Sequence, residues 1–396
     1  MQQQDRANQL QLRQMTQITL IATTTFGLEA VVKRELLALG YKNLQASEGK
    51  IEFSATLEDI PTANLWLRSA DRVLLKLGEF NAVTFEELFE QTRALPWEAW
   101  IPVDGKFNVN GKSIRSTLES VSACQAIVKK AVVERLKAAY HKEWFEETGA
   151  EFTIQVALLK DTATLTIDTS GKGLTRRGYR THSGSAPLKE TLASALVQLS
   201  FWNKDRILVD PMCGSGTILI EAAMIGRNMA PGLKREFAAE KWPAIPDKVW
   251  RVARLKAFEA VDKQAELQIS GSDIDAEMVE AARVNARKAG VGQDILFEQK
   301  DVKDLWIDKQ YGILITNPPY GYKLGEFREM NDIYISLNKT FKKKTGWSIY
   351  VLTADKKFPD YFKRSRPDKV RKLFNGPIEV QFYQYFGDRP KYGIRE

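Results

Sequence analysis

Residues 206–217 read Arg-Ile-Leu-Val-Asp-Pro-Met-Cys-Gly-Ser-Gly-Thr, and this stretch indicates how the carboxyl-terminal half of the chain folds. Its apolar start is typical of a buried strand that ends at Asp210, and the apolar residues 218–225 are typical of a helix. Gly214 and Gly216 allow a ligand to approach the backbone closely. The first N–H groups of a helix have no partners within the helix and bind anions. The stretch therefore predicts a strand, a glycine turn and a helix that together bind an anionic group.

Two common ligands of glycine-rich turns are excluded, because this turn lacks the residues that bind them. A dinucleotide-binding turn has a third glycine where Leu219 stands, and a P-loop ends in Gly-Lys-Ser or Gly-Lys-Thr, which is absent. S-adenosylmethionine (SAM) fits, because its carboxylate can lie on the helix start and its ammonium can lie beside Asp210 or a nearby carbonyl. We expect SAM as cofactor, S-adenosylhomocysteine as its product, and a binding turn made of Asp210, Pro211, Cys213, Gly214, Ser215, Gly216 and Thr217.

Two further strands of the same half end in acidic residues. Residues 267–275 are predicted to form a strand that ends in acids, of which Asp273 has a carboxylate that suits both ribose hydroxyls. Residues 295–302 are predicted to form a third strand, whose Asp301 can accept from the adenine amino group. Ile274 and Val302 are the neighbouring cofactor contacts. Each acid alone is also explained as an ordinary strand-end residue. Helices alternate with these strands, so we expect a doubly wound, Rossmann-like α/β sheet over 186–396.

Thr316-Asn317-Pro318-Pro319-Tyr320-Gly321 follows the apolar run 311–315 and therefore stands at the carboxyl end of another strand. The two prolines end the strand and hold the next backbone extended. The Asn317 side-chain oxygen and the Pro318 carbonyl can accept both protons of a planar amine, which directs the nitrogen lone pair at an electrophile, while Tyr320 stacks on the base. We expect Asn317, Pro318, Pro319 and Tyr320 to be catalytic, with Asn317 also bordering the cofactor. A simple proline turn is the alternative reading.

The remaining elements divide the chain further. We expect a flexible tail at 1–15, a ferredoxin-like α+β domain at 16–80, a second α+β domain at 81–168 and a glycine-rich basic hinge at 169–185. Periodicity predicts strands at 18–23, 50–54, 73–80, 152–158 and 163–168, helices at 27–39, 60–70 and 122–140, and a strand with a turn at 107–111. In the last domain it predicts a helix at 186–200 with Pro187 in its first turn, a strand at 347–353 and a hairpin of 370–374 and 379–386.

Composition excludes several classes of protein. A chain of 396 residues with 44% hydrophobic and 27% charged residues is typical of a soluble globular protein of two or three domains. No apolar run is long enough to cross a membrane, and no signal peptide is evident at the start. Cys124 and Cys213 stand in different expected domains and the chain has two histidines, so neither a disulfide framework nor a metal site is expected. We expect a cytoplasmic location; the oligomeric state is not indicated.

Positive charge is concentrated in two regions. Residues 342–396 hold fourteen Lys or Arg and six Asp or Glu, a surplus of eight that equals the net charge of +8 for the whole chain. The second region is the hinge, where no acidic residue separates its Lys and Arg residues. Such clusters usually cover a solvated face, but beside a nucleobase site they favour phosphate binding. The RNA-binding candidates are Lys172, Arg176, Arg177 and Arg180.

Together these features carry a resemblance to a known family. Residues 81–168 resemble the THUMP domain, an RNA-binding module of RNA-modifying enzymes, and Phe26-Gly27-Leu28-Glu29 resembles the small domain that precedes it in one methyltransferase branch. The three motifs Asp210–Thr217, Ser272–Asp275 and Asn317–Gly321 are similar to those of class I RNA guanine-N2 methyltransferases of the RlmL/YpsC type. The resemblance spans about 16–390, is to the form with a single methyltransferase domain, and implies cofactor contacts from Lys189, Glu190 and Thr191.

The resemblance implies SAM-dependent methylation of guanine N2, with 23S ribosomal RNA as the expected partner. Transfer RNA is an alternative substrate within the same chemistry. Adenine N6 of DNA or RNA is a second alternative, because an Asn-Pro-Pro-Tyr loop can hold either exocyclic amine. A non-catalytic RNA-binding assembly factor that keeps the cofactor fold is an alternative of another class.

Overall fold

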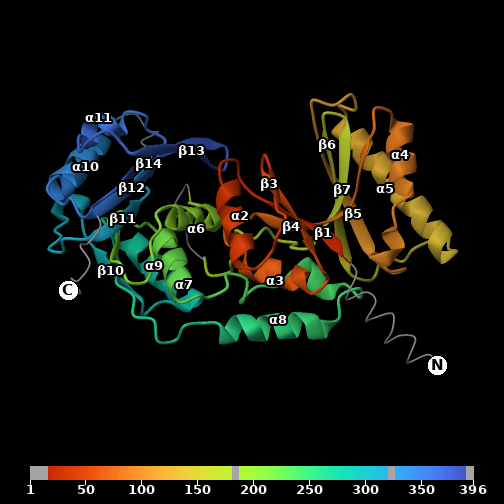
Figure 1. Cartoon of the computed structure of the whole chain (residues 1–396), viewed down its shortest axis with the longest axis horizontal. Helices are drawn as coiled ribbons and strands as arrows, with labels where there is room; N and C mark the ends of the chain where they lie inside the picture. Colours follow the sequence, from red (N-terminus) through yellow and green to blue (C-terminus); the bar gives the residue numbers. More distant parts are fainter. Residues whose placement is uncertain (1–16, 181–186, 320–325, 389–396) are drawn as a thin grey trace. The chain divides into compact units, whose positions relative to one another are not determined.

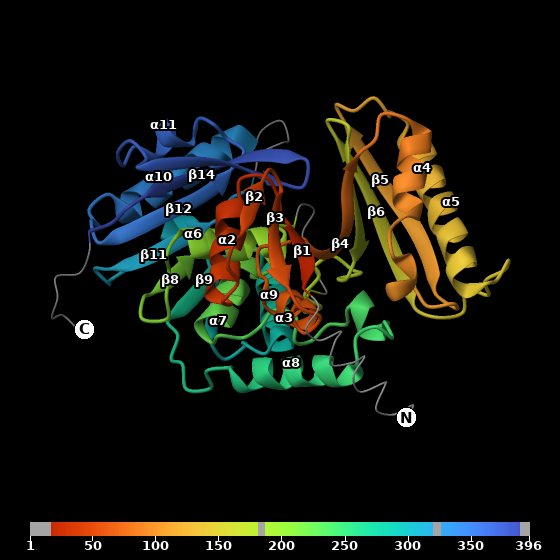
Figure 2. The same ribbon diagram turned by 45° about the vertical axis from the view of Figure 1, so that its right-hand side comes forward.

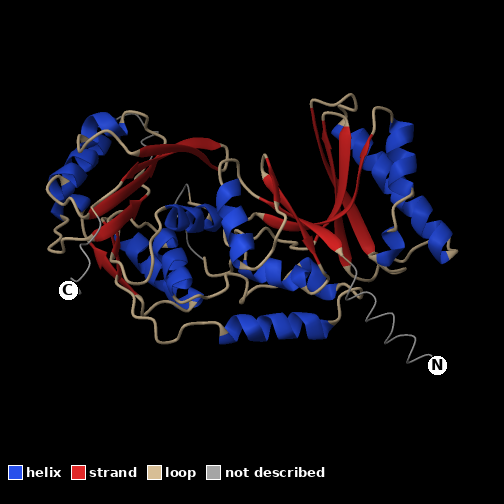
Figure 3. Ribbon diagram, in the orientation of Figure 1, coloured by secondary structure: helices blue, strands red, loops and turns tan. Residues whose placement is uncertain are grey.

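The computed structural model describes residues 17–180, 187–319 and 326–388, and these form two compact units (Figure 1). Unit 1 contains residues 17–24, Val32–Leu174 and Arg235–Lys256. Unit 2 contains Thr25–Val31, Thr175–Lys234 and the described residues from Ala257 onward. Each unit has its own seven-stranded sheet, and Figure 3 shows the sheets in red with helices against them.

The first part of unit 1 is the expected ferredoxin-like domain. Strand β1 lies between β3 and β4 and pairs with both in antiparallel register. Alternate residues of β3 are buried, whereas β1 buries the continuous run Leu20–Ala22 in the middle of the sheet. The elements are β1 (Ile18–Thr23), α2 (Glu29–Ala38), β2 (Gln45–Ser47), β3 (Lys50–Ala55), α3 (Asp59–Trp66) and β4 (Arg72–Asn81).

The second part of unit 1 is the THUMP-like domain. Strand β4 also pairs with β7, so both parts share one sheet of order β2-β3-β1-β4-β7-β6-β5. Figure 2 shows α4 and α5 side by side, and α5 packs against β5 and β6. The elements are α4 (Phe85–Arg93), the short helix η1 (Trp97–Ala99), β5 (Lys106–Ile114), α5 (Val121–Tyr140), β6 (Glu151–Leu159) and β7 (Thr162–Asp168).

The turn predicted at the end of 107–111 is wrong. Strand β5 continues through Gly111 to Ile114 and pairs in parallel with β6 along its whole length. A Cβ atom at Gly111 would lie 3.0 Å from the Gln125 side chain and 3.2 Å from that of Val121. The glycine therefore serves close packing of β5 against α5, a role that sequence alone does not distinguish from a turn.

Residues 235–256 lie in unit 1, although the sequence places them in the methyltransferase domain of 186–396. This segment contains η2 (Ala238–Lys241) and most of α8 (Asp247–Glu259). The Trp242 ring stacks on Phe152 with centroids 4.9 Å apart, and its Nε1 donates to the Glu151 carbonyl. Burial of these aromatic rings holds the segment on the β6 side of the unit 1 core.

The start of the expected hinge is fixed within unit 1. Thr169 and Ser170 are both fully buried. The Thr169 hydroxyl donates to the Val73 carbonyl at 2.6 Å, and the Ser170 hydroxyl donates to Asn64 Oδ1 at 2.6 Å. Residues 169–174 are therefore an ordered extension of the THUMP-like domain. Residues 181–186 of the hinge and the tail 1–15 lie outside the described residues.

Unit 2 is the expected doubly wound sheet. Five parallel strands and one antiparallel hairpin are arranged in the order β10-β9-β8-β11-β12-β14-β13. The strands are β8 (Leu208–Asp210), β9 (Ile269–Asp273), β10 (Ile295–Gln299), β11 (Gly312–Thr316), β12 (Trp347–Thr353), β13 (Lys369–Asn375) and β14 (Ile378–Tyr385).

Two separate apolar clusters cover the faces of this sheet. One contains residues of α6, α7 and α9, and the other contains residues of α10 and α11. The helices are α6 (Glu190–Leu199), α7 (Thr217–Gly226), α9 (Ala276–Ala289), η3 (Val302–Asp304), α10 (Glu326–Phe341) and α11 (Phe358–Phe362). Helix α6 starts at Glu190 rather than at residue 186, because Lys189 has an extended backbone, so Pro187 precedes the helix instead of lying in its first turn.

Candidate active site

Three sequence motifs meet at one edge of the unit 2 sheet. Strand β8 is paired in parallel with β9 on one side and β11 on the other, so their carboxyl ends are adjacent. Asp210, Asp273 and Thr316 are the last residues of these three strands. The Thr316 hydroxyl donates to Asp210 Oδ1 at 2.7 Å, a bond that joins the glycine-turn motif to the Asn-Pro-Pro motif. Ligands of doubly wound sheets bind at this edge.

Asp210 is nearly fully buried beneath the edge, with 2% of its surface exposed. Its carboxylate also accepts a hydrogen bond from the Met212 backbone N–H at 3.2 Å. Burial raises the pKa of Asp210 to about 7, an effect that nearby Asp273 reinforces and the two hydrogen bonds oppose. A buried carboxylate in this state is suited to a cationic ligand group, because such a group would replace the lost solvation and favour the ionised form.

The glycine turn has one open position and one packed position. Gly214 has a φ of +50°, and a Cβ built there would meet no atom within 4 Å among the described residues, so the backbone is open to a ligand. Its N–H donates to Asp273 Oδ2 at 2.8 Å. Gly216 has a φ of +81°, and a Cβ built there would lie 3.0 Å from the Ala282 side chain. Because glycine has no side chain, α7 can begin close to α9. The turn thus exposes the backbone where α7 begins, as predicted for an anion site.

The carboxyl ends of β9 and β10 supply the next set of predicted residues. Asp273 is partly exposed and its Oδ1 accepts from the Asp275 N–H at 3.1 Å. Ile274 is 66% exposed, an unusual state for isoleucine that suits an apolar contact with a bound ring. Asp301 caps η3 by accepting from the Lys303 N–H, and Val302 is buried beneath it. Their strands are adjacent and parallel, so the four predicted residues stand at one edge.

The Asn-Pro-Pro motif follows β11 at the same edge. Asn317 is partly buried, and its Oδ1 is enclosed without a hydrogen-bond donor among the described residues. A buried acceptor without a partner costs free energy unless a ligand supplies a donor. Pro318 is buried and Pro319 is exposed. Tyr320, the fourth predicted catalytic residue, lies outside the described residues.

The segment predicted to cover the cofactor edge is Lys189–Thr191. Lys189 precedes α6, and its N–H donates to Asn375 Oδ1 at 3.5 Å. Glu190 is buried, pairs with Arg180 at 3.2 Å and accepts from the Thr175 hydroxyl at 2.8 Å. Thr191 is buried in the first turn of α6. The Glu190 carboxylate therefore holds Thr175 and Arg180 of the hinge in place. A direct cofactor contact from Lys189–Thr191 stays a prediction.

Two of the four RNA-binding candidates have structural partners instead of exposed charges. Arg177 is 3% exposed and its Nε donates to Glu221 Oε1 at 3.4 Å. Arg180 Nη2 donates to the Thr217 hydroxyl at 3.0 Å. Burial makes Arg177 unsuitable for phosphate binding, which corrects the expectation from charge alone, whereas Lys172 and Arg176 are exposed. Glu221, a lone acid within the apolar run of α7, was the available signal for a buried cationic partner.

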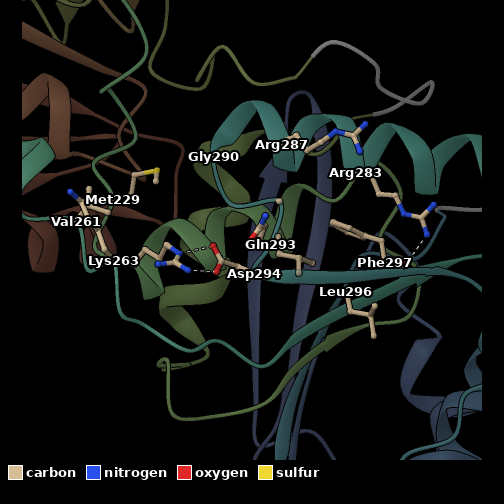
Figure 4. A pocket seen from close by; sticks show the side chains of 13 residues that line it. Met229, Val261, Lys263, Arg283, Arg287, Gly290, Gln293, Asp294, Leu296 and Phe297 are labelled. Atoms are coloured by element: carbon tan, nitrogen blue, oxygen red, sulfur yellow. Dashed lines mark hydrogen bonds and ion pairs between the residues drawn. The ribbon is translucent and has the colours of Figure 1, made fainter.

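A hollow of about 790 Å³ lies elsewhere on unit 2 (Figure 4). Its lining includes Arg283 and Arg287 of α9 and Leu296 and Phe297 of the edge strand β10. Lining residues 290 and 292–295 lie at the carboxyl end of α9 and the amino end of β10. The parallel strands place that end of the sheet opposite Asp210 and Asn317. The hollow is therefore separate from the candidate site.

The described residues offer neither a group of metal ligands nor a helix of membrane-spanning character. That part of the chain contains no group of three His, Cys, Asp or Glu residues able to hold a metal ion. None of its helices is long and apolar enough to span a bilayer. Cys124 of unit 1 and Cys213 of unit 2 are free and buried.

Comparisons with known proteins agree with this arrangement. Family models match the chain as an RlmL ferredoxin-like domain at 19–74, a THUMP domain at 82–168 and an RMKL-like methyltransferase domain at 177–384. The protein named "Putative RNA methyltransferase YpsC" of Bacillus subtilis is 48% identical over 94% of this chain and 97% of its own length. The Ribosomal RNA large subunit methyltransferase K/L of Psychromonas ingrahamii is 37% identical over 91% of this chain and 49% of its own length.

Solved structures show the same fold over almost the whole chain. The structure described as "SMU.472, a putative methyltransferase complexed with SAH" is 44% identical with a TM-score of 0.89, over 95% of this chain and 99% of that one. A Listeria monocytogenes structure described as a predicted N6-adenine-specific DNA methylase is 47% identical with a TM-score of 0.91, over 96% and 98% of the two chains.

The fold, the site and the similarity to known families and structures define a class I SAM-dependent methyltransferase that carries a THUMP domain. The chain belongs to the RlmK/L-like RNA methyltransferase family, with the RlmL ferredoxin-like domain preceding THUMP. The expected SAM cofactor and the predicted fold class are thereby confirmed. One contact at the site was missed from sequence: the Thr316 hydroxyl bond to Asp210, which the polar end of an otherwise apolar strand could have suggested.

Proposed function

We propose that this protein methylates the exocyclic N2 amine of a guanosine in large-subunit ribosomal RNA. The observation that carries the proposal is the enclosed Asn317 Oδ1, which lacks a donor among the described residues and stands at the same sheet edge as the glycine turn. An acceptor in that position is suited to an N–H2 group. The large-subunit name of the Psychromonas ingrahamii relative supports ribosomal RNA as the substrate class.

The site fits SAM on the features of its own residues. Gly214 leaves space at the turn, the start of α7 provides free N–H groups, and Asp210 is a buried acid able to receive an ammonium. Asp273 and Asp301 follow neighbouring strands as acceptors for ribose hydroxyls and an adenine amine. When bound, SAM supplies a methyl group on an electrophilic sulfonium.

The protein's own residues position the nucleophile. Asn317 Oδ1 and the Pro318 carbonyl each accept a hydrogen bond from one N–H of the amine. These two bonds fix the plane of the amine and leave its lone pair free for attack. Pro318 and Pro319 hold the loop backbone extended, so the two acceptors keep their spacing. No strong base is needed, because the amine becomes acidic as it is methylated and releases its proton afterwards. Rate enhancement then comes from positioning and from exclusion of water.

Asn317→Ala tests the role of the acceptor. We expect methyl transfer to deproteinised ribosomal RNA to fall by at least about 100-fold, the loss typical when a positioning contact is removed. SAM affinity, measured by calorimetry, should change little. Asn317→Asp keeps an acceptor oxygen and should retain more activity than the alanine variant. Equal losses of SAM binding and transfer in Asn317→Ala would contradict the assigned role.

Adenine N6 methylation is the second candidate, because both acceptors serve either amine and a similar solved structure is described as a predicted adenine methylase. The THUMP domain favours RNA over DNA, whereas exposed Lys172 and Arg176 can bind the phosphates of either. Methyl-labelled product digested to nucleosides and separated by mass spectrometry distinguishes N2-methylguanosine from N6-methyladenosine. Ribosomal and transfer RNA offered separately identify the substrate pool, and absence of transfer to any RNA would favour the assembly-factor alternative.

A further inference from the structure

An aromatic residue from the amino-terminal sequence lies on the methyltransferase unit. Thr25–Val31 belongs to unit 2, although residues on both sides of it in sequence belong to unit 1. Gly27 has a φ of +90°, and a Cβ there would lie 3.0 Å from the Lys372 carbonyl, so the segment passes close to the edge strand β13. Phe26 is thereby placed against Phe374, with ring centroids 6.2 Å apart and planes at 72°.

This aromatic pair is accompanied by positive charge. Phe26 is 49% exposed, and the Lys372 ammonium lies 5.4 Å from the Phe374 ring centroid. Lys372 and Lys356 both pair with Glu379, at 2.7 Å and 3.4 Å, so two cations share one carboxylate and a surplus of positive charge remains. Exposed aromatic rings interleaved with lysines are typical of single-stranded nucleic-acid contacts. We name the group of Phe26, Lys356, Lys372 and Phe374 the aromatic lip.

The sheet register places the aromatic lip at the edge that holds the active site. Val351 of β12 is paired with Thr316, and β12 continues to Thr353, which is paired with Gln381 of antiparallel β14. The β13–β14 turn, where Asn375 pairs with Ile378, therefore extends beyond the carboxyl edge (Figure 1). Asn375 Oδ1 also accepts from the N–H of Lys189, next to the start of α6.

We propose that the aromatic lip binds an unpaired RNA nucleotide that flanks the target guanosine. Its base stacks on Phe26, and Lys372 and Lys356 contact its phosphates. This inference rests on the proposed function, because it assumes that RNA enters at the carboxyl edge. A splayed target leaves its neighbours unstacked, so a protein ring that restacks one neighbour offsets part of that cost.

Phe26→Ala is the central test, with Phe258→Ala as the matched control. Phe258 is also in unit 2 and is 58% exposed, but it lies on α8. Loss of one base–aromatic stack should weaken binding of a labelled single-stranded oligoribonucleotide, and raise KM for ribosomal RNA, by about 5-fold to 150-fold. Phe26→Trp should restore binding. SAM affinity and the thermal midpoint should match the wild type in all three variants.

Lys372→Gln tests the charged part of the aromatic lip. Removing one phosphate contact should reduce the slope of log affinity against log salt concentration by about one, with little dependence on RNA sequence. An unchanged slope together with unchanged affinity would remove Lys372 from the proposal. Unchanged RNA affinity in Phe26→Ala, or equal losses in Phe26→Ala and Phe258→Ala, would overturn it.

Direct RNA binding separates this inference from the proposed function. If the wild type transfers no methyl group to guanosine but Phe26→Ala still weakens RNA binding selectively, the aromatic lip stands and the reaction assignment fails. If transfer to guanosine occurs with unchanged KM and affinity in Phe26→Ala, the reaction assignment stands and the aromatic lip fails. A loss of SAM affinity in Phe26→Ala would show a structural role and would also overturn the inference.

Discussion

Thr316→Val removes the hydroxyl that connects the two motifs of the active site. The hydroxyl is fully buried and donates to Asp210 Oδ1 at 2.7 Å, so it stabilises the ionised carboxylate. Valine has nearly the same shape, which limits the change to the loss of one hydrogen bond. The remaining hydrogen bond to Asp210 comes from the Met212 N–H.

The size of the effect follows from the strength of a hydrogen bond to a charged group, about 1.5–3 kcal/mol. That free energy corresponds to a rise of about one to two pH units in the midpoint at which Asp210 ionises. The wild-type carboxyl, with a pKa of about 7, is half ionised near pH 7. If SAM binds the ionised form, its affinity at pH 7 should fall by about 5-fold to 50-fold in the variant.

Calorimetric SAM titration from pH 6 to pH 9 measures this effect. The affinities of wild type and Thr316→Val should converge at high pH, where both carboxyls are ionised. Thr316→Ser keeps the hydroxyl and should follow the wild-type curve. A loss of SAM affinity that is constant over the whole pH range would refute the reasoning, because it would show a packing defect rather than an altered ionisation.

Two further predictions concern folding. Because the pKa of Asp210 is raised in the folded protein, its contribution to stability is present below the usual carboxyl pKa and is lost as pH rises towards about 7. Asp210→Asn should therefore gain stability relative to wild type between about pH 4 and pH 7, measured by urea unfolding, and an unchanged difference would contradict this sign. Trp242→Ala should destabilise unit 1 by about 3–5 kcal/mol through loss of a buried ring, whereas Trp306→Ala, 74% exposed, should change unfolding by less than about 0.5 kcal/mol.

Local patterns were sufficient for much of unit 2. The apolar run before Asp210 and the glycines after it define a strand, a turn and a helix, because each depends on neighbouring residues alone. The strand at Trp347–Thr353 and the hairpin of β13 and β14 were predicted for the same reason. In unit 1, the strands predicted at 152–158 and 163–168 correspond to β6 and β7, which pair in antiparallel register.

Other features depended on contacts between distant residues, which no local pattern contains. Gly111 packs against α5 instead of forming a turn. Trp242 packs on the unit 1 core, so residues 235–256 lie in unit 1 and not in the expected methyltransferase domain. Arg177 belongs to a hinge that looks solvent-exposed, yet it is buried against Glu221. A single sequence gives residue type and spacing but not the partner that buries a charge.

The sequence by itself determined the chemical parts of the site, namely a glycine turn, strand-end acids and an Asn-Pro-Pro loop. Only the tertiary structure decided that Thr316 bonds to Asp210 and that Phe26 lies on β13. The physical reason is that side-chain chemistry is a property of each residue alone. Contacts such as Thr316 with Asp210, which are 106 positions apart, and Phe26 with Phe374 form only when the folded chain brings distant segments together.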